Sequence, residues 1–228
     1  MTILAVTGLK REARILAGPG LVAIPGGGRD AQALEALLAA QAARAEAIIS
    51  LGIGGALAAG LKPGDWVVAT AVAGGAEAAT DPAWTAALLG RLPSAVSGIV
   101  LGSDRMLTTA LEKRAAHDRF GALAVDMEST AAVRLAQRFG LPFAVARVIS
   151  DAADTDLPDA VKVGMNPDGG MALGAVLWAL AKNPAQLPGL MRTGRDAGRA
   201  FRALADGCRL LGPRIGLPDL VQLPLDVG

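Results

Sequence analysis

We expect a three-layer α/β/α fold around a central mixed, mainly parallel sheet, and two observations predict it. Short apolar runs that are typical of buried strands alternate with helix-like runs along the first 182 residues. In chains of this kind, helices cover both faces of a largely parallel sheet. The chain of 228 residues is 52% hydrophobic, which is enough for one α/β domain with a large core.

The expected elements follow one another in alternating order. The first apolar run, Ile3-Leu4-Ala5-Val6, indicates a strand, and a turn at Lys62-Pro63-Gly64 precedes another strand. Apolar residues at helical spacing over 30–44 indicate an amphipathic helix, and the pair Asn183-Pro184 ends the last helix of this part. We expect strands at 3–7, 21–24, 47–51, 65–73, 97–102, 122–126 and 143–149, with helices at 10–16, 30–44, 108–120, 128–139 and 169–181.

The character of the sequence changes after Pro184, so we divide the chain into a domain of residues 1–182 and a C-terminal helical extension of residues 183–228. Residues 190–211 predict an amphipathic helix with an arginine-rich face and an apolar face. Two interpretations of this helix stay open: it packs on its own domain and turns its arginines to water, or it contacts a membrane surface. The arginine-rich face carries Arg192, Arg195, Arg199, Arg202 and Arg209, with Asp206 among them.

Composition excludes several classes of protein. Aromatic residues make up 3% of the chain and the net charge is +1, so neither a base-stacking surface nor a general attraction to nucleic acid is expected. The single cysteine, Cys208, and the single histidine, His117, exclude an internal disulfide and a zinc site built from these two residue types. We place His117 and the charged run 113–119 on a solvated helix face, and we expect no metal and no cofactor.

Two carboxylates, Glu128 and Asp151, are the strongest candidates for chemistry. Glu128 opens an expected helix and Asp151 ends the strand after it, so both reach the edge of the sheet at which α/β folds bind ligands. Cleavage of an N-glycosidic bond passes through a cationic sugar and needs an acid at the leaving group. The apolar strand before Asp151 favours desolvation, which lets a carboxylic acid keep its proton near neutral pH. The alternative is that Asp151 or Asp154 caps the next helix.

Glu128 is the candidate for binding the ribose hydroxyls. An ionised carboxylate only accepts hydrogen bonds, so it can take the 2′- and 3′-hydroxyl protons and lie near the positive charge on the sugar. The alternative is an ordinary acid in a first helical turn, stabilised by the helix dipole. Met127 lies against the sugar or else belongs to the core. Arg147 shares a strand face with Asp151 and either orients a carboxylate or forms a structural ion pair.

Two glycine-rich turns are candidates for close contact with a ligand. The run 25–29 precedes an expected helix, so Gly28 and Arg29 are candidates for an anion site. The run 51–56 follows a strand, and Gly52 and Gly54 permit close approach of the backbone to a substrate. Neither run has the spacing of a P-loop or of a dinucleotide-binding motif.

Taken together, these motifs resemble the purine nucleoside phosphorylase/nucleosidase superfamily, and most closely its methylthioadenosine/S-adenosylhomocysteine nucleosidase branch. Residues 125–129, Val-Asp-Met-Glu-Ser, are similar to the Val-Glu-Met-Glu-Ala pattern of that branch. Residues 142–154 are similar to its Pro-Phe…Arg-x-Ile-Ser-Asp-x-Ala-Asp pattern, and residues 61–65 to its Leu-Lys-x-Gly-Asp turn. The resemblance covers residues 1–182 and implies an enzyme that cleaves N-glycosidic bonds.

The resemblance assigns roles to several residues. Asp151 would protonate nitrogen 7 of the purine, and Ser150 would support the loop that binds the base. Glu12 falls where nucleosidases keep the carboxylate that activates water; without the resemblance, Glu12 is a surface acid among basic neighbours. Met106 and Leu107 fall where the family packs side chains around the base. The implied partner is a nucleoside, and a homodimer or larger homo-oligomer is expected.

Departures from the family pattern bear on the reaction. The phosphorylases carry arginine and serine phosphate ligands around the second glycine-rich run, where this chain has Ser50 and Ile53, so we favour hydrolysis. Lys10, Arg11 and Arg29 can rebuild an anion site, which keeps phosphate open as a co-substrate. The aromatic lid of the branch is missing from the stretch 74–93, which is shorter here.

The alanine-rich, tyrosine-free domain with its arginine-striped helix looks like the hopanoid-associated phosphorylase group, which is associated with removing adenine from adenosylhopane to leave ribosyl-hopane. This resemblance implies a lipid-linked substrate and peripheral contact with the inner membrane surface through residues 190–211. Because the chain starts with a strand-like run rather than a signal peptide, we expect a cytoplasmic protein. Two alternatives stay open: a nucleosidase for soluble nucleosides (methylthioadenosine, S-adenosylhomocysteine or futalosine) and a non-catalytic module that binds lipid or nucleotide.

Overall fold

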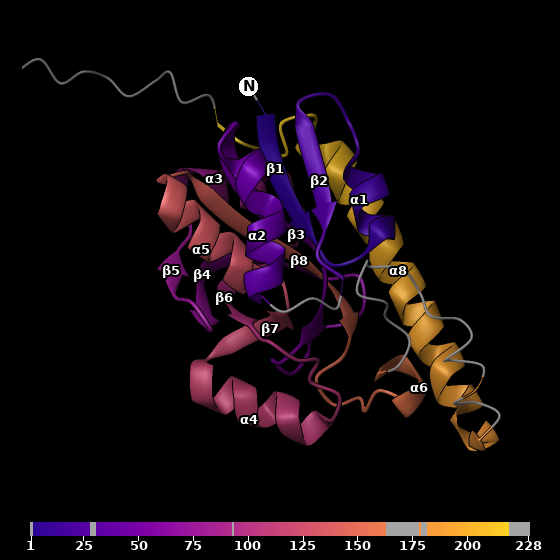
Figure 1. Ribbon diagram of the computed structural model, residues 1–228. Helices are drawn as coiled ribbons and strands as arrows, with labels where there is room; N and C mark the ends of the chain where they lie inside the picture. The colour runs from indigo at the N-terminus through magenta and orange to yellow at the C-terminus, as the bar shows by residue number, and fades with distance from the viewer. Residues whose placement is uncertain (1, 28–30, 93, 163–177, 179–181, 219–228) are drawn as a thin grey trace, which may run out of the picture.

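The fold is a three-layer α/β/α arrangement around one mixed sheet, as the sequence predicts (Figure 1). The computed structural model describes residues 2–27, 31–92, 94–162, 178 and 182–218. The strands are β1 (Thr2–Thr7), β2 (Leu21–Pro25), β3 (Ala45–Ala56), β4 (Trp66–Gly74), β5 (Ala78–Ala79), β6 (Val96–Gly102), β7 (Ala122–Asp126) and β8 (Phe143–Asp151). The helices are α1 (Lys10–Leu16), α2 (Ala31–Ala42), α3 (Pro82–Arg91), α4 (Ala110–Phe120), α5 (Ser129–Phe139), α6 (Asp159–Lys162), the short 3₁₀ helix η1 (Pro184–Gln186) and α8 (Leu187–Leu211).

Local capping explains where the helices begin and end. The Thr109 hydroxyl accepts from the amide of Glu112 at 3.2 Å and Glu112 accepts from the Thr109 amide at 3.1 Å, so α4 begins two residues later than predicted. Helices α4 and α5 end at Gly121 and Gly140, whose φ angles of 63° and 62° are left-handed and favour glycine. Helix α3 was not among the predicted elements, although Asp81-Pro82 is a helix-start signal. The helix predicted over 169–181 lies almost entirely outside the described residues.

The sheet closes on itself, which the sequence does not predict. Strand β3 pairs in parallel with β1 and β8, and its last residues pair antiparallel with β7. Strand β4 joins β8 to β6, and β6 joins β7, so the five strands β3, β8, β4, β6 and β7 form a ring of hydrogen-bonded neighbours. Gly55 of β3 is paired with Val125 of β7 and with Asp151 of β8. Closure therefore brings the carboxyl ends of β7 and β8 to the same place.

The glycine-rich run 51–56 is part of strand β3, so its prediction as a turn is wrong. A Cβ atom at Gly54 would lie 2.7 Å from the carbonyl oxygen of Val125, and one at Gly52 would lie 2.6 Å from the Glu12 Oε1 atom. Glycine is needed here because neighbouring groups approach the strand too closely for any side chain, and not because the backbone turns.

Two apolar cores lie on the two faces of the sheet, because successive strand residues point to opposite faces. Leu4 and Val6 of β1 pack with Leu34 of α2 and with α5, whereas the alternate residues Ile3 and Ala5 pack in the core covered by α1, α3 and α8. A smaller cluster under α4 contains Leu107 and Val125. Figure 1 shows α2 and α5 on one side of the strands and α1 with α8 on the other.

Helix α8 forms part of the second core over its C-terminal half only. Its buried residues are Ala200, Phe201, Leu204, Gly207 and Leu211, and no described residue between 187 and 199 is buried. Thus this half of the helix packs on the domain, while the arginine-rich face is exposed, as predicted. The N-terminal half extends beyond the strands at the lower right of Figure 1. Among the described residues, no helix is both long enough and apolar enough to span a bilayer.

We expect Gly207→Ala to destabilise the protein by about 1–3 kcal/mol, because the added methyl group would overlap the Trp66 ring in a packed core. The matched control is Gly194→Ala in the same helix, where no atom lies within 4 Å of the added carbon. This control should stabilise the protein by up to about 1 kcal/mol through helix propensity. Urea unfolding measures both changes, and equal effects of the two substitutions would contradict the packing of α8 on β4.

Candidate active site

Glu12 and Glu128 face each other across Gly8, which follows strand β1. A Cβ atom built on Gly8 would lie 3.0 Å from the Glu128 Oε1 atom and 3.4 Å from the Glu12 Oε2 atom. Glu12 comes from α1 and Glu128 immediately precedes α5, so the chain brings two distant carboxyl groups to one point at the end of the strands. Because Gly8 has no side chain, both carboxyl groups can lie close to its backbone.

Glu12 is buried, with 1% of its surface exposed, so its interpretation as a surface acid is wrong. Its Oε2 atom accepts from the Leu9 amide at 2.6 Å, and its Oε1 atom accepts from the Ile53 amide at 2.6 Å. Burial raises the pKa of Glu12, while these amides and the charge of Arg147 act in the opposite direction. Both oxygens are thus held in place by backbone groups of α1 and β3.

Glu128 is buried, with 7% of its surface exposed, and it immediately precedes the first turn of α5. Its side chain makes no cap to α5, and its Oε2 atom accepts from the Met127 amide at 3.3 Å. Burial and, next, the charge of Asp126 raise the pKa of Glu128 to about 8. Arg147 acts against this shift, and Glu12 adds to it.

Arg147 forms a buried ion pair with Asp126, so the predicted ion pair is confirmed and its partner is Asp126. The Arg147 Nη2 atom lies 2.7 Å from the Asp126 Oδ2 atom and donates to the Ser50 hydroxyl at 2.5 Å. Asp126 Oδ1 also accepts from the amides of Glu128 and Ser129 at 3.2 and 2.9 Å, so Asp126 caps α5. We did not predict Asp126 as a site residue, although an acid at a strand end two residues before Glu128 was an available signal.

Asp151 lies in a polar, charge-paired setting, so the expected apolar surrounding is wrong. The Lys113 Nζ atom donates to Asp151 Oδ2 at 2.6 Å, and the Ser150 hydroxyl donates to Asp151 Oδ1 at 2.7 Å. Asp151 does not cap a described helix, because α6 begins only at Asp159. Lys113 is completely buried, so the prediction that the run 113–119 lies on a solvated face is wrong at this residue.

The other predicted substrate-binding residues lie around these acids, and their contacts with a substrate stay predictions. Met127 is half-buried between Asp126 and Glu128. Leu107 is buried in the cluster under α4, and its neighbour Met106 is half-buried in the segment before that helix. Gly52 and Gly54 lie in β3, facing Glu12 and Arg147.

The predicted anion-binding residues are only partly described. Gly28 and Arg29 lie outside the described residues. The guanidinium of Arg11 lies over the Phe201 ring of α8, 4.1 Å from its centroid. The Gly26 and Gly27 amides donate to the carbonyls of Thr7 and Gly8 at 2.6 and 2.8 Å. These two amides hold the loop against β1.

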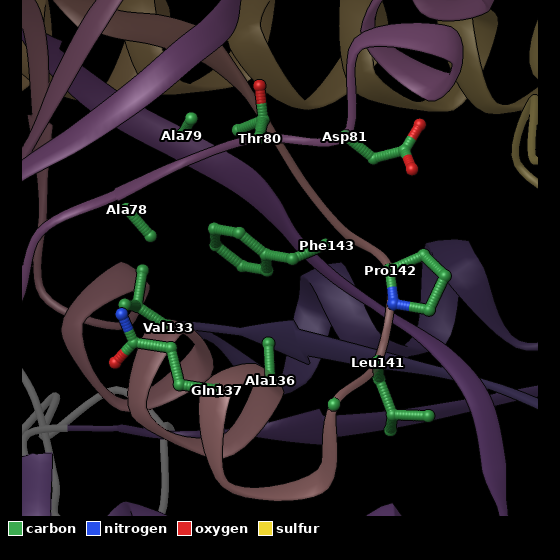
Figure 2. Close-up of a pocket in the computed structure, with 11 residues that line it drawn as sticks. Ala78, Ala79, Thr80, Asp81, Val133, Ala136, Gln137, Leu141, Pro142 and Phe143 are labelled. Atoms are coloured by element: carbon green, nitrogen blue, oxygen red, sulfur yellow. The ribbon is translucent and has the colours of Figure 1, made fainter.

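A separate cavity of about 330 Å³ lies at the opposite end of the same elements, and Figure 2 shows the residues that line it. Phe143 in its wall begins β8, whereas Asp151 ends that strand. Gln137 lies in the last turns of α5, whereas Glu128 precedes its first turn. A nine-residue strand spans roughly 30 Å, so this cavity lies far from the carboxylates. Within the described part of the chain, no group of histidine, cysteine and acidic residues is placed to hold a metal ion.

A sequence profile of the phosphorylase superfamily matches residues 5–181 of the chain. The chain belongs to the phosphorylase superfamily. A 5′-methylthioadenosine/S-adenosylhomocysteine nucleosidase of Staphylococcus saprophyticus is 35% identical over 81 residues. That match covers 35% of this chain and 32% of the relative, so the chain matches about a third of the relative's length.

Solved structures of the superfamily share the fold. The 5′-methylthioadenosine/S-adenosylhomocysteine nucleosidase of Helicobacter pylori aligns with a TM-score of 0.66 at 15% identity, covering 92% of this chain and 96% of that one. The futalosine hydrolase of the same organism aligns with a TM-score of 0.65 at 14% identity, covering 92% and 97%. The nucleosidase of Neisseria meningitidis aligns with a TM-score of 0.66 at 17% identity, covering 95% and 99%. The predicted superfamily and fold are therefore confirmed.

The raised pKa of Glu128 predicts that the free energy of unfolding falls as pH rises from about 4.5 to about 8. In this window the folded chain holds a proton that the unfolded chain releases, so stability is greatest below the unfolded pKa and levels off above about 8. Glu128→Gln should reduce the slope by up to about 1.4 kcal/mol per pH unit. Glu35→Gln, at a partly exposed acid, is the matched control. Urea unfolding across this range measures the slopes, and an unchanged slope in Glu128→Gln would contradict the prediction.

Proposed function

We propose that this chain cleaves the N-glycosidic bond of an adenine nucleoside and releases adenine. The observation that carries the proposal is the pair of buried carboxyl groups, Glu12 and Glu128, that face each other at Gly8 beside the strand ends carrying Asp151. A cationic sugar is stabilised by nearby carboxylates, and a departing base is helped by an acid. Membership of the phosphorylase superfamily supports this chemistry.

Each acid has one role in the proposed reaction. Asp151 gives a proton to nitrogen 7 of adenine while the bond between the base and the sugar breaks and its electron pair leaves with the base. Glu128 accepts hydrogen bonds from the ribose hydroxyls. Glu12 removes a proton from the water that attacks the sugar carbon. Water supplies the new oxygen on the sugar, so the reaction is a hydrolysis.

Water rather than phosphate is the proposed acceptor. The amides of Leu9 and Ile53 donate to Glu12, so these two backbone groups offer no hydrogen bond to an anion. A phosphate would also meet the negative charge of Glu12 and Glu128 whenever these acids are ionised. Phosphate as co-substrate, through Arg11 and Arg29, remains the alternative and is an outcome of the test below.

The proposed substrate is adenosylhopane, with ribosyl-hopane as the product. The resemblance to the hopanoid-associated group supports this choice, and so does the projecting half of α8. That half carries two exposed apolar residues, Leu187 and Met191, next to the exposed Arg192, Arg195 and Arg199. Apolar and basic side chains on one helix are suited to peripheral contact with an anionic membrane, where a lipid-linked nucleoside resides. We also propose a homodimer, which the superfamily resemblance implies.

A soluble nucleoside is the second candidate substrate. The curated relative of Staphylococcus saprophyticus is a methylthioadenosine/S-adenosylhomocysteine nucleosidase, and one structural neighbour is a futalosine hydrolase. These similarities favour methylthioadenosine, S-adenosylhomocysteine or futalosine.

The purified protein should release adenine from adenosylhopane faster than from methylthioadenosine, at a rate that does not depend on added phosphate. Asp151→Asn should lower turnover by about 100-fold or more, because the leaving base is no longer protonated. Chromatography of released adenine measures each rate. Faster turnover of methylthioadenosine would replace the lipid by a soluble substrate, and a need for phosphate would replace hydrolysis by phosphorolysis. Ligand binding without turnover by the wild type would identify a non-catalytic module.

Replacing Arg192, Arg195 and Arg199 by glutamine should weaken binding to vesicles of phosphatidylglycerol and phosphatidylcholine by about 3 kcal/mol, from about 1 kcal/mol per basic residue. Turnover of methylthioadenosine should not change, because these side chains are exposed on the projecting half of α8. The charge-matched control replaces the scattered, exposed Arg44, Arg114 and Arg138, none of which lies on α8, by glutamine. Co-sedimentation measures binding, and equal losses in both triple variants would argue against a docking surface on α8.

A further inference from the structure

Lys113 of α4 is a completely buried lysine whose ammonium group has a full set of partners. Its Nζ atom donates to the Asp151 Oδ2 atom at 2.6 Å and to the carbonyl oxygens of Ala152 and Thr155, each at 2.9 Å. An ammonium has three hydrogen-bond donors, so this arrangement uses all of them. Burying a charge is costly unless it is paired and hydrogen-bonded, and this one is both.

The same contacts attach α4 to the turn that follows β8. Besides Lys113, the Ala110 amide donates to Asp156 Oδ1 at 2.7 Å and the Leu157 amide donates to the Thr108 carbonyl at 2.8 Å. The turn therefore has several anchors to α4, of which only Lys113 reaches the Asp151 carboxylate. Loss of Lys113 would leave the other two anchors in place.

The two oxygens of Asp151 have different neighbours. Oδ2 faces the Lys113 ammonium, which donates hydrogen bonds and cannot accept one. Oδ1 faces the Ser150 hydroxyl at 2.7 Å, and that hydroxyl also lies 3.1 Å from the Gly54 carbonyl oxygen. A hydroxyl has one proton, so it can donate to Asp151 or to Gly54, and in the second case it can accept from Asp151.

We propose that Lys113 is a positioning residue that holds Asp151 so that Oδ1 carries the proton given to the leaving base. The inference rests on the proposed function and deepens it. Oδ1 takes up a proton from solvent when the nucleoside binds and donates it in a hydrogen bond to the base, while Ser150 donates to Gly54. The proton then moves to nitrogen 7 as the glycosidic bond breaks, and Asp151 becomes a carboxylate. The Ser150 hydroxyl turns to donate to Oδ1, and the Lys113 ammonium balances the new negative charge.

A substrate whose leaving group needs no proton separates this role from a structural one. The test compares Lys113→Met with the wild type on two substrates. One is whichever of adenosylhopane and methylthioadenosine the wild type turns over faster, and the other is 4-nitrophenyl β-D-riboside. For adenine release, kcat should fall by about 100-fold with KM nearly unchanged, because the acid step loses its positioning. For nitrophenolate release, kcat should fall by less than about threefold, because this leaving group departs without a proton. Arg114→Met removes an exposed cation from the next residue of α4 and should change neither rate.

A second variant covers the case in which the riboside is a poor substrate. Lys113→Ala leaves space for a small amine, and ethylammonium added to this variant should restore adenine release at least tenfold, whereas tetramethylammonium, which has no N–H donor, should not. A thermal melt of each variant checks that it is folded.

The outcomes separate the two proposals. The role of Lys113 would be overturned if Lys113→Met lost turnover of both substrates equally or kept its rate of adenine release. It would also be overturned if ethylammonium did not restore activity to Lys113→Ala. In each case, adenine release by the wild type would still support the nucleosidase. A wild type that releases adenine from neither nucleoside would overturn the proposed function itself, and the role of Lys113 with it.

Discussion

The buried ion pair between Arg147 and Asp126 joins the elements from which the candidate site is built. Arg147 is in β8 and Asp126 ends β7, two strands that both neighbour β3. Ser50 of β3 and Ser129 of α5 complete the network through their hydroxyls. Removing one partner of such a buried pair typically costs about 3–5 kcal/mol, because the other charge is left without compensation. Closure of the sheet and the position of α5 therefore depend on the same two side chains.

This pair also determines the charge balance of the site. Arg147 offsets Asp126 directly, so little of its positive charge is left for Glu12 and Glu128, both of which have raised pKa values through burial. Asp151 is different, because it has a cation of its own in Lys113. The acids at this end of the sheet thus have two kinds of surroundings. Glu12 and Glu128 lie where little positive charge is available, whereas Asp151 is paired with the Lys113 ammonium. Separate environments are how one fold gives carboxyl groups different tasks at the same pH.

Helix α8 has two parts that its sequence pattern alone does not separate. Its C-terminal half completes the core beneath α1 and α3, where Gly207 allows close approach to Trp66. Its N-terminal half has no buried residue among those described and presents arginines with exposed apolar side chains. The same helix can therefore be needed for stability and also be available for a partner, because burial ends near Ala200.

The sequence by itself determined the order of the strands and helices apart from α3, β5 and α6, the superfamily, and Glu12, Glu128 and Asp151 as the candidate carboxylates. Apolar periodicity and capping signals act locally, so α1 and β7 begin and end where they were predicted. Only the tertiary structure decided that Glu12 is buried, that residues 51–56 continue a strand, that Arg147 pairs with Asp126 and that Lys113 lies against Asp151. Burial and charge pairing depend on which distant elements close over a residue, and here the closure of the sheet around β3 makes that choice.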